Sequence, residues 1–92
     1  MTRGDDGTIA IAVRVEGAQS VELSGDLTRW QPVALVQGSD GRWWGRFPDP
    51  AVAVVEVAVR VDGGTWLVPP GTDAVRDEFG GVAGRLVLPA RR

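Results

Sequence analysis

Apolar and polar residues alternate in a series of short runs along this chain of 92 residues. In the longest run, valines occupy every second position, and the positions between them hold Glu56, Ala58 and Arg60. A period of two places alternate side chains on opposite faces of a β-strand, so the valines face a core and the other side faces solvent or a ligand. Similar runs cover residues 9–15, 20–24, 33–36, 42–47, 65–68 and 85–88, with a further short strand expected at 74–78.

Turn-forming residues separate these runs at intervals of about 8–12 residues. Asp40-Gly41 precedes an aromatic run, as in a β-hairpin, and Pro69-Pro70 excludes a helix from the segment around it. No segment has the i, i+3, i+4 spacing of a stable helix. We therefore expect an all-β fold, an antiparallel immunoglobulin-like β-sandwich of seven or eight short strands. The domain is expected to cover residues 8–89, between a flexible N-terminal tail at 1–7 and a C-terminal tail at 90–92.

Two of the four tryptophans lie on predicted turns. Trp30 follows the turn at Gly25-Asp26, and Trp66 follows the turn at Asp62-Gly63-Gly64. A loop tip offers little packing for so large an apolar side chain. Either the two rings form a platform for a flat, partly apolar ligand, or both cap the ends of the core, and the spacing leaves both interpretations open.

The other two tryptophans are adjacent, so only one of them can face the core. Trp43 shares its parity with Phe47 and is predicted to be structural. Trp44 is then outward, covered by Arg46 or part of an interface. Asp26 is expected to accept hydrogen bonds from nearby backbone amides, and the alternative is a role in a ligand site.

The composition excludes several classes of function. The chain has no cysteine and no histidine, which removes thiolate chemistry, the usual metal ligand and the usual general base. Asp77 and Glu78 are adjacent carboxylates that point to opposite faces of a strand, so they cannot flank one glycosidic bond. We expect no enzyme activity and no metal or other cofactor. The sequence pI near 4.9 argues against nucleic-acid and membrane partners, and no apolar run approaches the ~20 residues of a membrane span, so we expect a soluble, cytoplasmic protein.

The order of turns and aromatic residues resembles carbohydrate-binding module family 48. This family includes the glycogen-binding domain of the AMP-activated protein kinase β subunit and the N-terminal sandwich domains of isoamylase and branching enzymes. The matching pieces occur in the family's order, at about its spacing, over roughly residues 13–88; they are Ser24-Gly25-Asp26-Leu27-Thr28-Arg29-Trp30, Asp40-Gly41-Arg42-Trp43, Val59-Arg60-Val61-Asp62-Gly63 leading to Trp66, and Asp77-Glu78-Phe79-Gly80-Gly81. The resemblance implies a non-catalytic module that binds α-1,4-linked glucan, such as glycogen or starch, in a targeting or regulatory role.

The resemblance also implies which residues touch the sugar. Trp30 and Trp66 match the two tryptophans that stack on glucose rings, and Phe79 falls where the family has a bulky apolar residue that threads the curve of the ligand. A glucose ring has an apolar C–H face, and covering it with an indole removes apolar area from water at ~25 cal/mol/Å².

Two polar positions of the family are changed in this chain. Ala58 stands where the family has a lysine, and Ala83 lies in the short loop expected where the family has an asparagine. Both alanines are predicted to be exposed, and Arg60, on the same face as Ala58, is the candidate replacement for the lysine. The alternative is the same sandwich with a degenerate sugar site, which binds a partner protein or a catalytic domain through Trp44 and the exposed edge of the Val52–Val61 strand.

Overall fold

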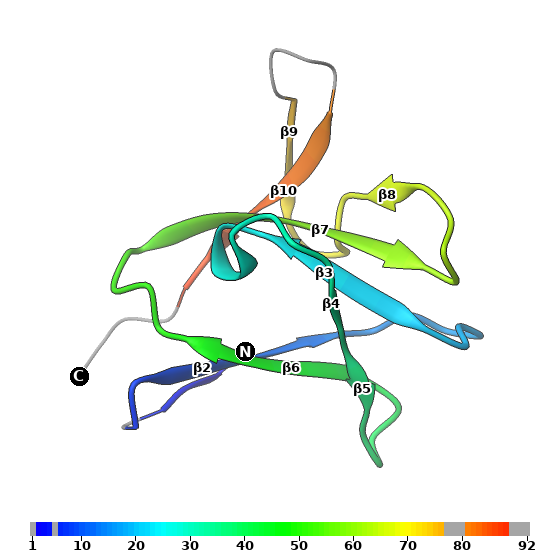
Figure 1. The fold of residues 1–92 in the computed structure, drawn as a ribbon, viewed down its shortest axis with the longest axis horizontal. Coiled ribbons are helices and arrows are strands. Elements are labelled where there is room, and N and C mark those ends of the chain that lie inside the picture. The colour runs from blue at the N-terminus through cyan, green and yellow to red at the C-terminus, as the bar shows by residue number, and fades with distance from the viewer. Residues whose placement is uncertain (1, 5, 77–80, 89–92) are drawn as a thin grey trace.

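Two antiparallel sheets lie face to face as the two layers of a sandwich (Figure 1). This computed structural model describes residues 2–4, 6–76 and 81–88. Within those residues, the four-stranded sheet has the order β1 (Thr2–Arg3), β2 (Thr8–Val13), β6 (Trp43–Pro48) and β5 (Val36–Gln37). The six-stranded sheet has the order β4 (Val33–Ala34), β3 (Val21–Gly25), β7 (Val54–Val61), β10 (Val82–Val87) and β9 (Asp73–Arg76), and β8 (Trp66–Leu67) also pairs with β7. The expected all-β antiparallel sandwich is confirmed.

The core fills the space between the two layers, as the alternation predicts. Its side chains come from the inward positions of both sheets: Ile9, Ile11, Val13, Val21, Leu23, Leu35, Trp43, Phe47, Val55, Val57, Val59 and Leu88. Trp43 is 6% exposed, which confirms its inward assignment. No described residue accepts a hydrogen bond from its buried indole N–H.

The strand predicted at 33–36 is divided between the two sheets. Val33–Ala34 pairs with β3, whereas Val36–Gln37 pairs with β6, so the chain passes from one layer to the other at Leu35 (Figure 1). The Leu35 side chain is buried, and a Cβ at Gly45 would come within 2.6 Å of its Cδ2 atom. This division and the additional strand β1 explain why the described residues form ten strands rather than seven or eight.

At the N-terminus, where a flexible tail is expected over residues 1–7, β1 pairs with β2. A turn before Thr8 brings the chain back: the amide and the hydroxyl of Thr8 donate to Asp6 Oδ1 at 3.1 and 2.6 Å. The amide of Gly4 donates to the carbonyl of Thr8 at 2.9 Å. Hydrophobic periodicity does not predict such a strand, because these polar contacts hold it in place.

Two expectations about the six-stranded sheet are wrong. Strand β7 is not an edge strand, because β3 pairs with residues 57–61 on one side of it and β10 and β8 pair along the other. Ala58 and Ala83 are not exposed: their exposed fractions are 3% and 8%, and Ala83 belongs to strand β10 rather than to a loop. The alternation correctly turned Ala58 away from the core, but a methyl group rises little above a sheet, so an outward alanine can still be buried.

Candidate functional site

The loop after β3 presents Trp30 in a constrained conformation. It begins with the 3-10 helix η1 (Asp26–Thr28), and the hydroxyl of Thr28 contacts the amide and the carbonyl of Gly25 at 3.1 and 3.2 Å. The next two residues, Arg29 and Trp30, have φ angles of 55° and 60°. This left-handed region costs a non-glycine residue about 1–2 kcal/mol. The loop therefore holds Trp30 in a backbone conformation that is usually adopted by glycine or asparagine.

Asp26 joins this loop to strand β7 and orients the indole. Its Oδ2 atom accepts a hydrogen bond from the backbone amide of Glu56 at 2.8 Å, and its Oδ1 atom accepts one from Trp30 Nε1 at 3.2 Å. The loop lies so close to β7 that a Cβ at Gly25 would collide with the carbonyl oxygen of Glu56. Asp26 was expected to bind nearby backbone amides; it does bind a backbone amide, but this amide belongs to a strand thirty residues away.

The exposed indole borders a hollow of about 310 Å³ on the outward side of the six-stranded sheet. Its lining consists of Trp30, Glu56, Val75, Arg76, Gly81, Val82 and Ala83. Trp30 is 48% exposed, so the ring offers a wall to a ligand. Glu56 and Arg76 add a hydrogen-bond acceptor and a donor, and no described residue forms a salt bridge with either of them.

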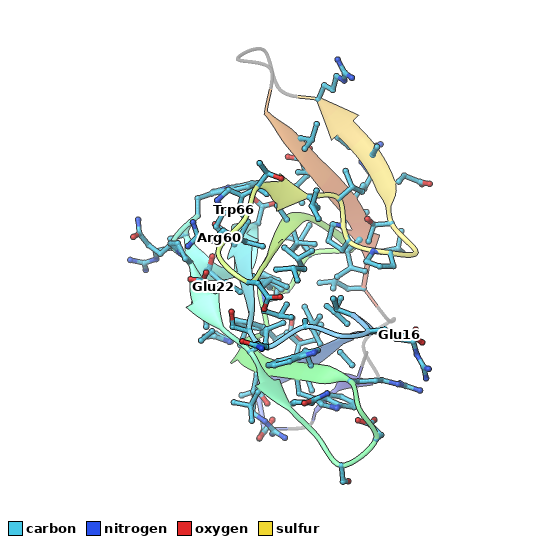
Figure 2. The ribbon with its side chains drawn as sticks, turned by 90° about the vertical axis from the view of Figure 1, so that its right-hand side faces the viewer. Glu16, Glu22, Arg60 and Trp66 are labelled. Carbon is cyan, nitrogen blue, oxygen red and sulfur yellow. The ribbon has the colours of Figure 1, made fainter. Side chains whose placement is uncertain are left out.

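Trp66 belongs to a different cluster, with Arg60 and Glu22 (Figure 2). In the register of the sheet Arg60 lies opposite Glu22 of β3 on one side and Trp66 of β8 on the other. Its Nε and Nη2 atoms are each 2.8 Å from Glu22 Oε1, and its Cζ atom is 4.7 Å from the centroid of the Trp66 ring. The hydrogen bonds from Arg60 lower the pKa of Glu22 below its ordinary value, and those same bonds to Glu22 raise the pKa of Arg60.

The structure thus divides the residues that the sequence assigned to one site. Trp30 lines the hollow, whereas Trp66 and Arg60 pack against each other outside its lining. Phe79 lies outside the described residues, as do Asp77 and Glu78. Within the described ranges no second tryptophan lines the hollow.

Sequence reasoning did not single out Glu56, Val75, Arg76 or Val82 as site residues. Glu56 carried a signal, because the alternation placed it on the outward side of its strand. Val75 and Arg76 carried none, since their place at the hollow depends on the pairing of β9 with β10. That pairing puts Ala83 opposite Val75 and Val82 opposite Arg76.

The chemistry available at the hollow is that of binding. An indole ring, apolar side chains, one carboxylate and one guanidinium can hold a ring that has an apolar face and a polar rim. Nowhere in the described part of the chain do three or more metal-ligating side chains gather, and no helix there is long and apolar enough to cross a bilayer. No protein-family model matches this chain, and no curated protein matches it either.

Proposed function

We propose that this domain is a non-catalytic module that binds α-1,4-linked glucan, such as glycogen or starch, at the hollow beside Trp30. The conformation of Trp30 carries the proposal. A large apolar ring is kept 48% exposed, on left-handed backbone, by an aspartate that fixes its indole N–H. Strained backbone and a pre-oriented exposed aromatic ring are features of ligand sites rather than of surface loops without a role.

The residues around the ring fit a sugar. The apolar face of a glucose unit can lie on the indole, which removes apolar area from water at ~25 cal/mol/Å². Glu56 can accept and Arg76 can donate hydrogen bonds to hydroxyl groups at the rim of the ring, each worth about 0.5–1.5 kcal/mol net. One aromatic wall and two polar contacts give weak binding, in the millimolar to micromolar range. The choice of α-glucan among sugars rests on the resemblance of the turn and tryptophan pattern to carbohydrate-binding module family 48.

A protein-binding role is the second candidate, and one surface favours it. Val54 of β7 lies opposite Val87 of β10 on the outward side, and these side chains are 42% and 65% exposed. Val52, which is 47% exposed, precedes them in the chain. An exposed group of valines is typical of a contact with another protein or with a catalytic domain of a larger assembly.

Affinity electrophoresis in gels that contain glycogen tests the glucan proposal. We expect the wild-type protein to be retarded and the Trp30→Ala variant to migrate as in a gel without glycogen, because the ring that stacks on the sugar is lost. Trp44→Ala is the matched control: its indole N–H is also bound by an aspartate four residues earlier, but on the other sheet. Equal retardation of wild type and Trp30→Ala, with both proteins folded, would place sugar binding elsewhere. Absence of retardation in the wild type would favour the valine surface and a protein partner.

A further inference from the structure

We propose that the glucan site consists of the Trp30 hollow alone and that Trp66 is not a second stacking platform. The site then takes a short run of sugar, about two or three rings, and gains nothing from a longer chain. This inference rests on the proposed glucan binding and specifies which ligand lengths the site distinguishes. Three observations carry it: the engagement of Trp66, the burial of the surface between the two tryptophans, and the spacing of Glu56 and Arg60 along β7.

The Trp66 ring is already in contact with a side chain of the protein. The guanidinium of Arg60 lies 4.7 Å from the ring centroid, within the range of a cation–π interaction. Glu22 holds that guanidinium through two of its nitrogens, so Arg60 is not a free donor for sugar hydroxyls. A ligand that used Arg60 would have to compete with a charge-assisted hydrogen bond of 2.8 Å.

The surface between Trp30 and the Trp66 cluster is closed to a ligand. Ala58 lies on β7 between Glu56, which lines the hollow, and Arg60, which contacts Trp66. Ala58 is 3% exposed, and its partner Ser24 on β3 is 6% exposed. A surface that water barely reaches cannot accept a sugar ring, and the methyl group of Ala58 offers no hydrogen bond. The described residues of β3 and β7 between the two tryptophans therefore offer no open surface to a sugar ring.

The separation makes a bridging ligand costly. Glu56 and Arg60 are four positions apart on one strand, which corresponds to about 13 Å at the rise of a β-strand. A glucan in contact with both tryptophans would have to arch over this stretch without support and lose conformational freedom for it. The Trp30 hollow, with a volume of about 310 Å³, lies at the small end of ligand sites.

Titration of the ¹⁵N-labelled wild-type protein with maltose, maltotriose and maltoheptaose tests the inference by NMR. We expect the Kd to fall from maltose to maltotriose and then by no more than about fivefold at maltoheptaose, a difference of about 1 kcal/mol. A longer glucan offers more registers in which the same short site can bind it, and this statistical effect alone gives a gain of that size. Shift changes should concentrate on Glu56, Val75, Val82 and Ala83. A Kd for maltoheptaose more than about tenfold below that for maltotriose, with shift changes at Trp66 and Leu67, would overturn the inference.

Two variants separate the roles of the tryptophans with the same ligands. Trp66→Ala should bind maltoheptaose within about twofold of wild type, whereas Trp30→Ala should lose binding. Arg60→Met, which keeps an apolar stem beside the Trp66 ring, is the second variant, because Trp66→Ala could fail to fold; it should also bind like wild type. A folded Trp66→Ala or Arg60→Met protein that binds more than about fivefold more weakly would show that this cluster touches the sugar. If maltose, maltotriose and maltoheptaose all fail to bind the wild type at millimolar concentration, the proposed function falls together with this inference.

Discussion

Trp30 and Trp44 make the same hydrogen bond on opposite sheets of the sandwich. In each case the indole Nε1 donates to the Oδ1 atom of an aspartate four residues earlier, at 3.2 Å. Trp30 stands on a loop with left-handed backbone, is 48% exposed and borders a hollow. Trp44 lies in the regular strand β6, half-buried, with Ala12 on one neighbouring strand and Val36 on the other.

The difference shows that the aspartate orients the ring in both places but does not create a site. The hollow at Trp30 exists because the loop after β3 lies against β7 and because the β9–β10 hairpin extends away from the body of the sandwich (Figure 1). The residues that line the hollow come from both of these features. At Trp44 the neighbouring strands continue the sheet on both sides, so the ring lies on a flat face.

The largest expected effect is the difference in stability between alanine variants of Trp43, which lies in the core, and of Trp44, which faces outward. Trp43→Ala should lower the free energy of unfolding by about 3–5 kcal/mol, because it leaves a cavity between the sheets. Trp44→Ala should cost about 1 kcal/mol, since it removes a half-buried ring and one hydrogen bond to Asp40. Urea unfolding of both variants measures the difference. The reverse ranking would mean that β6 is shifted by one residue, and Trp44 would then no longer serve as an outward control for Trp30.

A lysine on each outer face compares how open the two faces are. Ala58→Lys should lower the free energy of unfolding by about 1–3 kcal/mol, because Ala58 is 3% exposed and a longer side chain must displace its neighbours. Ala12→Lys, at the half-buried outward position beside Trp44, should change it by about 0.5 kcal/mol.

Thermal unfolding of the two lysine variants, monitored by circular dichroism, gives the comparison. Equal costs would mean that the face between Trp30 and Trp66 is as open as the other one. A lysine at position 58 would then be free to reach a ligand, and the proposal that sugar is confined to the Trp30 hollow would lose its main support.

The sequence predicted those parts of the fold that depend on local alternation. The inward side of β7 and the opposite orientations of Trp43 and Trp44 followed from a period of two, which each strand carries by itself. The crossing of the chain at Leu35 did not follow, because the two halves of residues 33–36 pair with different sheets, and pairing partners leave no trace in a run of four residues.

The sequence pointed to Trp30 of the candidate site but not to the residues that lie around it. Trp30 was recognisable because a loop tip offers little packing for so large an apolar side chain. The ion pair between Arg60 and Glu22 could not be predicted, because it depends on the register between β3 and β7. That register is reinforced by Asp62, whose Oδ1 atom accepts hydrogen bonds from the amides of Gln19 and Ser20, each at 2.8 Å. Whether Arg60 is available to bind a sugar therefore depends on the hydrogen bonds of Asp62 in the adjacent turn.

The smallest expected effect concerns the charges that hold the two outer faces. The pKa of Glu22 is lowered chiefly by its hydrogen bond with Arg60, and the pKa of Asp40 is lowered chiefly by the backbone amide of Arg42 and then by the indole of Trp44. A carboxyl group with a lowered pKa in the folded state contributes stability above its unfolded-state pKa and loses that contribution as the pH falls through its folded-state pKa. The contribution of Glu22 should therefore be present at neutral pH and disappear in acid.

NMR titration of the side-chain carboxyl carbons measures both groups in one protein. Arg60→Met should raise the titration midpoint of Glu22 to its ordinary value or slightly above it, because partial burial, which raises the pKa, then acts without the opposing hydrogen bonds. The titration midpoint of Asp40 should not move in the Arg60→Met variant. Trp44→Phe, in contrast, should raise the titration midpoint of Asp40 and leave that of Glu22 unchanged. The stability difference between wild type and Arg60→Met should also shrink as the pH falls through the Glu22 midpoint. If Glu22 titrates identically with and without Arg60, the ion pair does not hold the guanidinium in solution. Arg60 would then be free to leave the Trp66 ring, and the ring would be available to a sugar after all.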